Sequence, residues 1–386
     1  MWRSLASNML TILAIVLFLA AGVILWGQRQ YSSEGPLEAA ICLQVERGST
    51  MTRVSRELED QGAISSGAIF RIGSNYDDKT AKLKAGSFLL REHASMEEIV
   101  DQITRGGAST CGTEIVYRVG VTRTQVAVRE LDPATRGFVE RADFDLKSGE
   151  FPEVFVQKRA LADTRFRIAV AEGVTSWQVV DALKSIEVLS GEVGSRPAEG
   201  MLAPHSYEVT RGMERTALLA EMEALQQQRI AQAWDMREEG LPFDTPEEML
   251  ILASIIEKET GVADERGQVA SVFINRLERG MRLQTDPTVI YGVTKGEGVL
   301  GRGLRQSELR RVTPWNTYVI EGLPPTPIAN PGLASLEAAV APEKTDYVFF
   351  VADGSGGHAF AATLEEHNRN VAKWRKLEAD RQTGGD

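Results

Sequence analysis

One carboxylate lies where a helix would raise its pKa. Residues 247–260 predict a helix, and one of its faces follows the spacing i, i+3, i+4, i+7 through Leu252, Ile255, Ile256 and Glu259. Glu259 therefore extends an apolar stripe at the C-terminal end of the helix. Poor solvation and the negative end of the helix dipole both favour the protonated form of this carboxyl group, so its pKa rises. A general acid near neutral pH needs that shift.

The same helix allows two other interpretations. Glu257 lies roughly 200° around the helix axis from Glu259, on the side of Leu250 and Ala253, and is the weaker candidate. Alternatively, Glu259 is only the solvated end of an amphipathic helix, and helical geometry alone favours that ordinary interpretation.

Capping signals define the elements around this helix. Thr245, Pro246 and Glu248 form an N-terminal capping pattern for it. Six more elements are expected. They are a long amphipathic helix, three further helices, a hairpin and a last helix, at 214–238, Asp264 to Gly280, from Asp286-Pro287, from Asn330-Pro331, 346–361 and from Thr363. The pattern predicts a mainly helical domain, residues 195–378, with a small β element.

The first half carries a smaller α+β pattern, residues 41–112. Its expected elements are a strand at 41–46, a helix capped by Ser49 or Thr50, a short helix around Ile69, a strand at 86–90 and a helix opened by the capping box Ser95 to Glu98. This unit resembles a LysM-type module, and LysM modules bind glycans that contain N-acetylglucosamine. The expected fold class of the whole chain is α+β.

A short motif recurs along the first half. Gly48, Gly120 and Gly173 each follow a strand-like run, and each precedes a Thr cap and an amphipathic helical pattern with Val and Leu at matching places. A repeated LysM-derived strand–turn–helix unit and convergence on a generic turn explain this about equally well. The second and third copies lie in a connecting α+β region, residues 113–194, in which 121–164 is interpreted as an insertion.

The N-terminal segment is close to the length that one helix needs to cross a membrane. Met9 to Trp26 is an unbroken apolar run without charge. A thin charge bias favours a cytoplasmic amino terminus. A signal peptide cleaved near Ala20 is the alternative, although the apolar run continues past that point. The expected segments are a cytoplasmic tail (1–8), a transmembrane helix in the inner membrane (9–27), a linker (28–40), the periplasmic remainder, and a disordered tail (379–386).

Charge and cysteine usage exclude several classes. A net charge of −11 argues against nucleic acid as a partner, because a phosphate backbone selects basic surfaces. The four histidines are scattered, and Cys42 and Cys111 lack the spacing of a metal site, so neither a metal nor another cofactor is expected. Two thiols in an exported chain permit a Cys42–Cys111 disulfide, and two buried thiols that never pair are the alternative.

Long, ordered motifs in the second half resemble one family. They are ASIIEKETGVADERGQVASVFINRLERGMRLQTDPTVIYGV at 253–293, Asn316-Thr317-Tyr318, Gly322-Leu323-Pro324-Pro325, Ile328-Ala329-Asn330-Pro331-Gly332, and Phe350-Val351-Ala352-Asp353-Gly354 with Gly357-His358. They are similar to the signature region of the YceG-like endolytic murein transglycosylases, strongly over 195–376 and more loosely over 41–107. The resemblance implies that Glu259, the second Glu of Glu-Lys-Glu, is the catalytic acid.

The resemblance also implies a mechanism with one carboxyl group. Glu259 would protonate the bridging oxygen of a MurNAc–GlcNAc β-1,4 bond, and the MurNAc C6 hydroxyl, deprotonated by the same group, would close on C1 to leave a 1,6-anhydro end. A hydrolytic muramidase would need a second carboxylate to activate water. Asp264, Glu265 and Asp286 are possible ones. Because Asp264 and Asp286 are interpreted as helix caps, transglycosylation is modestly favoured.

The expected biological setting follows from that activity. The enzyme would cut nascent peptidoglycan strands, limit their length and accompany peptidoglycan synthases of the penicillin-binding type. The alternative from another class is a non-catalytic glycan-binding scaffold that recruits such synthases.

Several other side chains are suited to a sugar. Amides, hydroxyls and aromatic rings recognise hydroxyl-rich rings, which makes Gln284, Thr285, Asn316 and Tyr318 candidate substrate-binding residues. For each of them, capping a turn or filling the surface is an equally good explanation. His358 follows a Gly-rich turn and is a candidate to line the cleft, although a lone loop histidine is more often simply exposed. Arg276 either pairs with a carboxylate or decorates its helix.

Overall fold

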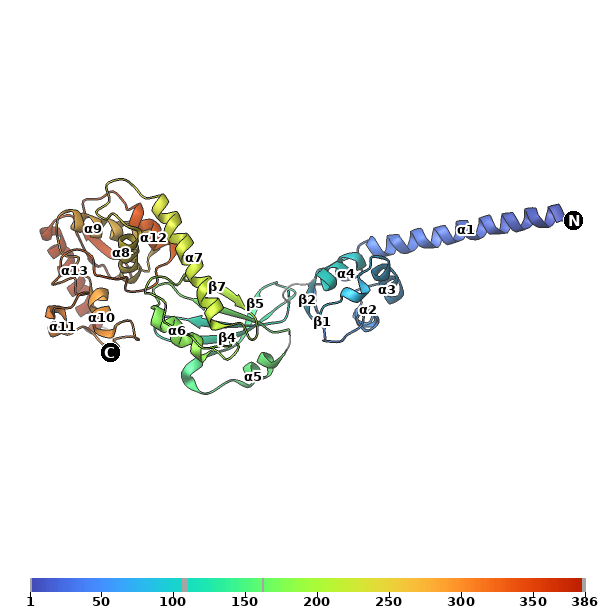
Figure 1. Cartoon of the computed structure of the whole chain (residues 1–386), viewed down its shortest axis with the longest axis horizontal. Helices are drawn as coiled ribbons and strands as arrows, with labels where there is room; N and C mark the ends of the chain where they lie inside the picture. The colour runs from blue at the N-terminus through green and yellow to red at the C-terminus, as the bar shows by residue number, and fades with distance from the viewer. Residues whose placement is uncertain (1, 106–109, 162, 384–386) are drawn as a thin grey trace. The chain divides into compact units, whose positions relative to one another are not determined.

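The computed structural model in Figure 1 describes residues 2–105, 110–161 and 163–383 and confirms a mixed α+β chain with one N-terminal apolar helix. The chain forms two compact units. Unit 1 comprises Met1–Ile115, Ala127–Phe144 and Glu150–Arg165, and unit 2 comprises Val116–Val126, Asp145–Gly149 and Phe166–Asp386. The division passes through strands β3 (Thr113–Val119) and β4 (Thr124–Leu131).

Helix α1 (Trp2–Ser32) contains the apolar run and is long and apolar enough over Met9–Ser32 to cross a membrane. It extends beyond the predicted end of the transmembrane helix at residue 27, so the first residues of the predicted linker are helical. Two local bonds continue the helix: Ser32 Oγ donates to Gln28 O at 3.1 Å, and Ser33 N donates to Arg29 O at 2.9 Å. Tyr31 then packs against the core of the following module.

The module of residues 41–112 has the predicted elements. Strands β1 (Ile41–Val45) and β2 (Gly86–Leu90) pair antiparallel, and α2 (Met51–Asp60), α3 (Gly67–Tyr76), η1 (Thr80–Lys82) and α4 (Met96–Arg105) accompany them. Thr50 caps α2, and Ser95 and Glu98 form the predicted capping box. The core is apolar, and its fully buried members include Leu43, Leu58, Phe70, Leu90, Ile99 and Ile103.

A disulfide joins Cys42 on β1 to Cys111, with 5.8 Å between the two Cα atoms. Cys111 N also donates to Ser87 O on β2 at 3.1 Å. The bond therefore closes a loop of 69 residues around the module. Such a link removes conformational freedom from the unfolded chain and stabilises the closed unit.

A five-stranded sheet has the order β5-β4-β3-β6-β7. Its other strands are β5 (Phe138–Asp145), β6 (Arg165–Val170) and β7 (Ser206–Val209), with η2 (Leu146–Ser148), α5 (Glu153–Ala160) and α6 (Ser176–Ser185) between them in the chain. Residues 121–164, interpreted as an insertion, therefore supply two strands of this sheet together with α5.

The predicted strand–turn–helix repeat is wrong in its second copy. Gly48 and Gly173 adopt φ angles of +81° and +74°, and the chain turns into α2 and α6 behind them. Gly120 instead donates its N–H to Arg123 O at 3.0 Å, which closes a hairpin into β4. The alternation of Val126 and Val128 with more polar residues suits a strand better than a helix. Without a left-handed glycine, the chain reverses and pairs as a strand.

The second half of unit 2 is mainly helical, as predicted. Its elements are α7 (Arg215–Asp235), α8 (Pro246–Glu259), η3 (Ala263–Glu265), α9 (Arg266–Glu278), α10 (Asp286–Thr294), α11 (Gln306–Arg310), α12 (Leu333–Val340), the hairpin β8 (Phe349–Ala352) and β9 (His358–Ala361), and α13 (Leu364–Thr383). Helix α8 is central, because α7, α9, α10 and α12 all pack on it. Eight consecutive residues of α8, 249–256, are buried.

The C-terminal end differs from the predicted disordered tail. Helix α13 continues to Thr383, and Arg381 Nη2 donates to Gly354 O at 2.5 Å, which ties the helix to the turn of the β8–β9 hairpin. Residues 384–386 lie outside the described residues.

Candidate active site

The end of α8 positions Glu259. Thr245 caps the start of the helix with Glu248 in a capping box, and Pro246 occupies its first turn. The helix ends at Glu259, because Thr260 adopts an extended backbone. The carboxyl group therefore leaves the packed centre of the domain at the last turn and stays partly exposed. A group placed in this way is desolvated by the protein and still reachable by a substrate.

The Glu259 carboxyl group has a raised pKa, and burial is the main cause. Thr285 Oγ1 donates a hydrogen bond of 2.8 Å to Glu259 Oε2, which favours the charged form and offsets part of the shift. The charges of His358 and Arg276 also lower the pKa of Glu259, while that of Asp286 raises it. The net result is a carboxyl group that holds its proton to a higher pH than an ordinary Glu.

Two segments that the sequence singled out, 284–288 and 316–318, are joined beside Glu259. Gln284 N donates to Thr317 O and Thr285 N donates to Thr317 Oγ1, both at 3.1 Å. Thr288 Oγ1 and Thr317 Oγ1 lie 2.8 Å apart. Gln284 itself is exposed and adopts a φ of 48°, a left-handed conformation that non-glycine residues rarely hold. The bonds to Thr317 hold this backbone and aim the Thr285 hydroxyl at Glu259.

Tyr318 and Asp286 form a second polar pair at the site. Tyr318 Oη donates to Asp286 Oδ1 at 2.7 Å, and burial together with this bond raises the pKa of Tyr318. The interpretation of Asp286 as a helix cap is wrong, because Thr285 occupies the N-cap of α10. Asp264 does not cap a helix either, since it lies inside η3. Asp286 is instead a second carboxylate of the site, and its negative charge contributes to the raised pKa of Glu259.

Asn316 lies behind this pair and is fully buried. Its Nδ2 donates to three carbonyl oxygens at the end of α11, those of Glu308 (3.2 Å), Leu309 (3.0 Å) and Arg311 (2.7 Å). Its Oδ1 accepts from Tyr318 N at 3.0 Å. The structure therefore places the Asn316 amide on the backbone, where it positions Tyr318.

His358 begins β9 and contacts Glu265 twice. Its Nδ1 lies 2.9 Å from Glu265 Oε2, and its backbone N donates to Glu265 Oε1 at 2.8 Å. The imidazole also meets the ring of Phe350 edge to face, with 5.2 Å between the ring centroids. This fixes the ring orientation near Glu259. The sequence named Glu265 only as a carboxylate for water, and its contact with His358 had no local signal because 93 residues separate the two.

Arg276 is a buried cation near the site. Its Nε donates to Val348 O at 2.7 Å and its Nη1 to Leu283 O at 2.6 Å. Burial lowers the pKa of Arg276. The sequence suggested either a carboxylate partner or decoration of the helix surface. The buried guanidinium instead binds two backbone carbonyls and joins α9 to the segments that precede β8 and α10.

The two residues before Glu259 are engaged elsewhere. Glu257 Oε2 accepts from Gly332 N at 3.0 Å and from Ser335 Oγ at 2.7 Å, so it caps the N-terminus of α12. Lys258 Nζ donates to Gly173 O at 3.2 Å. Each residue of the Glu-Lys-Glu sequence thus points to a different neighbour, and only Glu259 faces the 284–288 and 316–318 segments.

Comparison with known proteins identifies the family. The model of the YceG-like family matches residues 43–373 of the chain.

The chain belongs to the YceG-like family.

Relatives of known name cover most of the chain. An endolytic murein transglycosylase of Bacillus subtilis (strain 168) is 28% identical over 360 residues, which are 92% of this chain and 90% of the relative. An endolytic murein transglycosylase of Streptococcus pneumoniae (strain D39) is 27% identical over 379 residues, 94% of this chain. The chain spans 64% of the length of that pneumococcal relative. A crystal structure of a YceG-like protein from Listeria monocytogenes is 26% identical, with a TM-score of 0.46, and the match covers 86% of this chain and 98% of the other.

Metal ligands were not expected for this chain. Among the residues that the structure describes, no group of three or more His, Cys, Asp or Glu is arranged to hold a metal ion. That the protein works without a metal or another cofactor stays a prediction.

Proposed function

We propose that this YceG-like protein is a lytic transglycosylase that cleaves the MurNAc–GlcNAc β-1,4 bond of peptidoglycan. The observation that carries the proposal is Glu259, which has a raised pKa, accepts a hydrogen bond from Thr285 and ends the central helix of the family's domain. The names of the relatives from Bacillus subtilis and Streptococcus pneumoniae support the same substrate.

In the proposed reaction, Glu259 gives its proton to the oxygen that bridges the two sugars, and the bond between that oxygen and C1 of MurNAc breaks. The carboxylate left behind then takes the proton of the MurNAc C6 hydroxyl. The C6 oxygen closes on C1, which yields a 1,6-anhydro end and restores protonated Glu259. The Thr285 hydroxyl keeps its bond throughout and stabilises the carboxylate between the two proton transfers.

The neighbouring side chains are assigned roles by their contacts. Tyr318, held by Asp286, and the exposed Gln284 are proposed to contact the sugars. The His358 imidazole, oriented by Glu265, is proposed to face the developing charge near the bond that breaks. Asn316 is proposed to act through Tyr318 rather than on the substrate.

A hydrolytic muramidase is the second candidate, and one observation favours it. Asp286 is not engaged as a helix cap, and its charge acts on Glu259. A carboxylate in that place could activate a water molecule if the substrate left room for one. The hydrogen bond that Asp286 accepts from Tyr318 instead favours a structural role, in which Asp286 holds Tyr318 in place.

One digestion separates the candidates. Isolated peptidoglycan is incubated with the protein, with Glu259→Gln and, as a matched control, with Glu247→Gln from the exposed first turn of the same helix. Mass spectrometry should find anhydro-MurNAc ends with the unaltered protein and with Glu247→Gln, and none with Glu259→Gln. Reducing ends in their place would indicate hydrolysis, and no product at all would favour a glycan-binding scaffold.

We also propose that α1 anchors the protein in the inner membrane, with the remainder in the periplasm beside the synthases that make nascent strands. The apolar segment Met9–Ser32 supports the anchor, and the Cys42–Cys111 disulfide suits an oxidising compartment. The order β1-α2-α3-β2 supports a LysM-like, glycan-binding role for the module. Mass analysis of the mature N-terminus tests the anchor, because a processed chain beginning near Ala20 would mean a cleaved signal peptide.

A further inference from the structure

Helix α3 presents an uncharged, partly apolar stripe to solvent. Ile72 and Tyr76 are one helical turn apart, and 71% of the first and 82% of the second are exposed. Ala68, one turn earlier, and Asn75 complete the exposed face. Surface helices usually carry charged residues on such a face, and this face has none among these four residues.

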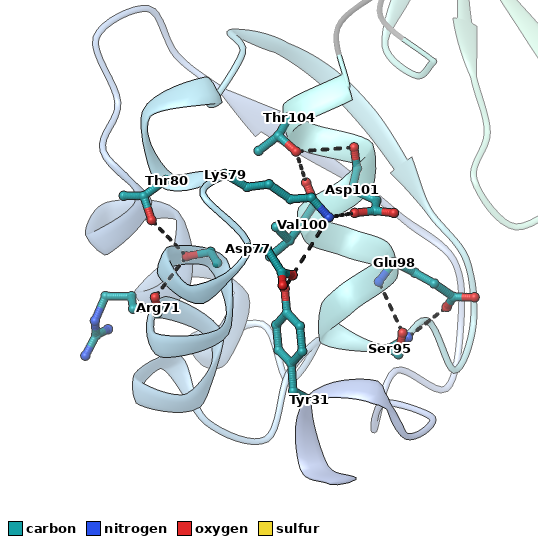
Figure 2. A network of polar contacts seen from close by, with 11 residues as sticks. Tyr31, Arg71, Asp77, Lys79, Thr80, Ser95, Glu98, Val100, Asp101 and Thr104 are labelled. Carbon is teal, nitrogen blue, oxygen red and sulfur yellow. Dashed lines mark hydrogen bonds and ion pairs between the residues drawn. The ribbon is translucent and has the colours of Figure 1, made fainter. Parts of the chain in front are cut away.

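The end of α1 holds α3 from both sides. Ser65, just before α3, donates from Oγ to Gln30 Oε1 at 3.4 Å, and Tyr31 Oη donates to Asp77 Oδ2, just after α3, at 3.0 Å. Figure 2 shows Tyr31 pointing to Asp77, whose neighbour Lys79 reaches Asp101 on α4. Because consecutive residues of α1 bind the two ends of α3, α3 lies across the axis of α1.

The two helices are also in direct contact. Gly73, in the middle of α3, faces the ring of Tyr31 so closely that a Cβ at position 73 would overlap the ring. Figure 1 shows α3 beside the end of α1, on the side of the module from which α1 leaves.

The height of α3 above the apolar segment follows from helix geometry. Tyr31 is five residues beyond Trp26, the last residue of the apolar run, which at 1.5 Å per residue is about 7–8 Å along α1. The polar layer on each side of a bilayer's hydrocarbon core is about 5–8 Å thick. A helix held at the level of Tyr31 therefore lies at the headgroup layer whenever α1 spans the membrane.

The exposed face of α3 is turned toward the apolar segment of α1. Phe70 and Ser74 face the core of the module, and Ile72 lies about 160° around α3 from Phe70 at ~100° per residue. Figure 1 shows the module beyond the end of α1 that is opposite the N-terminus. The face opposite that core therefore looks back along α1, toward the apolar segment.

We propose that α3 rests on the lipid headgroup layer of the membrane that α1 spans, with Ile72 and Tyr76 inserted into it. The inference rests on the proposed membrane anchor. A tyrosine suits this depth, because its ring is apolar and its hydroxyl stays in the polar layer. The α1–α3 contacts then orient the whole module relative to the bilayer rather than leaving it on a free tether.

The test uses the full chain in phospholipid vesicles. Ile72→Cys and Tyr76→Cys are labelled with an environment-sensitive fluorophore. Because Cys42 and Cys111 stay joined in the disulfide, the fluorophore reacts with the new thiol and not with them. The control is Arg105→Cys, exposed and next to Thr104, which lies at the end of α4 far from Tyr31 in Figure 2. We expect blue-shifted emission and quenching by headgroup-proximal nitroxide lipids at 72 and 76, and water-like emission at 105.

A second set of variants moves the fluorophore away from the two side chains that are proposed to insert. With the fluorophore at Ala68→Cys, the double change Ile72→Asp and Tyr76→Asp should abolish quenching by lipid, and Thr52→Asp on the exposed face of α2 should not. Water-like emission at 72 and 76 in chains that resist alkaline extraction from the vesicles would overturn the proposed contact of α3 with the headgroup layer. The proposed membrane anchor would then still hold. Release of the protein by alkaline extraction would overturn both.

Discussion

The module and the site each contain a tyrosine that donates to an aspartate, and the two pairs have different surroundings. Tyr31 binds Asp77 in the module, and the Asp77 carboxylate also lies 3.8 Å from Lys79 Nζ. Tyr318 binds Asp286 at the site, where the neighbouring carboxyl group of Glu259 takes a neutral hydroxyl donor, Thr285. In the module a nearby cation balances the negative charge, whereas at the site two carboxyl groups lie close together. The pair in the module joins the end of α3 to α1, whereas at the site burial is the main cause of the raised pKa of Glu259 and the charge of Asp286 adds to it.

The largest expected effect is the loss of activity in Glu259→Gln. Because an amide can neither give nor take the required proton, the rate of anhydro-end formation should fall by about 10³-fold or more. The measurement is product yield by mass spectrometry on isolated peptidoglycan. Glu247→Gln should keep full activity. Activity retained in Glu259→Gln would remove the site from the reaction altogether.

Removal of the disulfide should have the next largest effect, and it should change stability rather than activity. Changing Cys42 and Cys111 to Ser opens a loop of 69 residues, which should lower the free energy of unfolding by about 2–4 kcal/mol. Chemical denaturation followed by circular dichroism measures this, and adding a thiol reductant to the unaltered protein should reproduce the change. Equal midpoints in the oxidised and doubly substituted proteins would contradict it.

Thr285→Val should reduce activity by about 10- to 150-fold, since one hydrogen bond to a charged group is worth about 1.5–3 kcal/mol. The bond lowers the pKa of Glu259, so its removal raises that pKa further. The alkaline limb of the pH–rate profile should therefore move to higher pH. Thr285→Ser, which keeps the hydroxyl, should restore both the rate and the limb. A limb that moves to lower pH would refute the role given to Thr285.

The two tyrosines can be compared directly. Tyr31→Phe should lower the free energy of unfolding by about 1 kcal/mol and leave the rate on soluble glycan unchanged. Tyr318→Phe should slow the reaction several-fold with little effect on the unfolding midpoint. Thermal melts and initial rates on both variants give the four values. The comparison fails if the two substitutions have the same profile.

The smallest expected effect is a pH-dependent gain in stability for Glu259→Gln. The carboxyl group has a folded-state pKa raised from 4.5, so the folded state is favoured while the group is protonated and loses stability as pH rises from about 4.5 through the raised value. The Gln variant avoids that loss. Its melting temperature should match that of the unaltered protein at pH 4 and exceed it at pH 8. A variant less stable at pH 8 would show that the carboxylate stabilises the fold.

Local sequence signals predicted elements well where a cap and a periodic face coincided. The start of α8 was predicted from Thr245, Pro246 and Glu248, and its apolar stripe led to Glu259. The same reasoning failed for β4, because Gly, Thr, Val and Leu fit a helix or a strand until the φ of Gly120 decides. Residue propensity alone does not decide whether such a segment forms a helix or pairs with neighbouring strands.

The partners at the site were harder to predict, because they are distant in the chain. Nothing near Glu265 in the sequence indicates His358, and nothing near Asp286 indicates its donor Tyr318, which is 32 residues away. The order of the segments around α8 determines these contacts. The family motifs named the segments that meet there without giving their bonds.

The last turn of α8 has a mechanical consequence. Helix ends ordinarily fray, and a side chain on a fraying turn samples many positions. Here Glu257 is tied to α12 and Lys258 to the carbonyl of Gly173, immediately before Glu259. The terminus is thus clamped on two sides, so thermal motion of the carboxyl group is confined largely to its own torsions. In the proposed reaction, a proton donor held in this way keeps its orientation while the substrate binds.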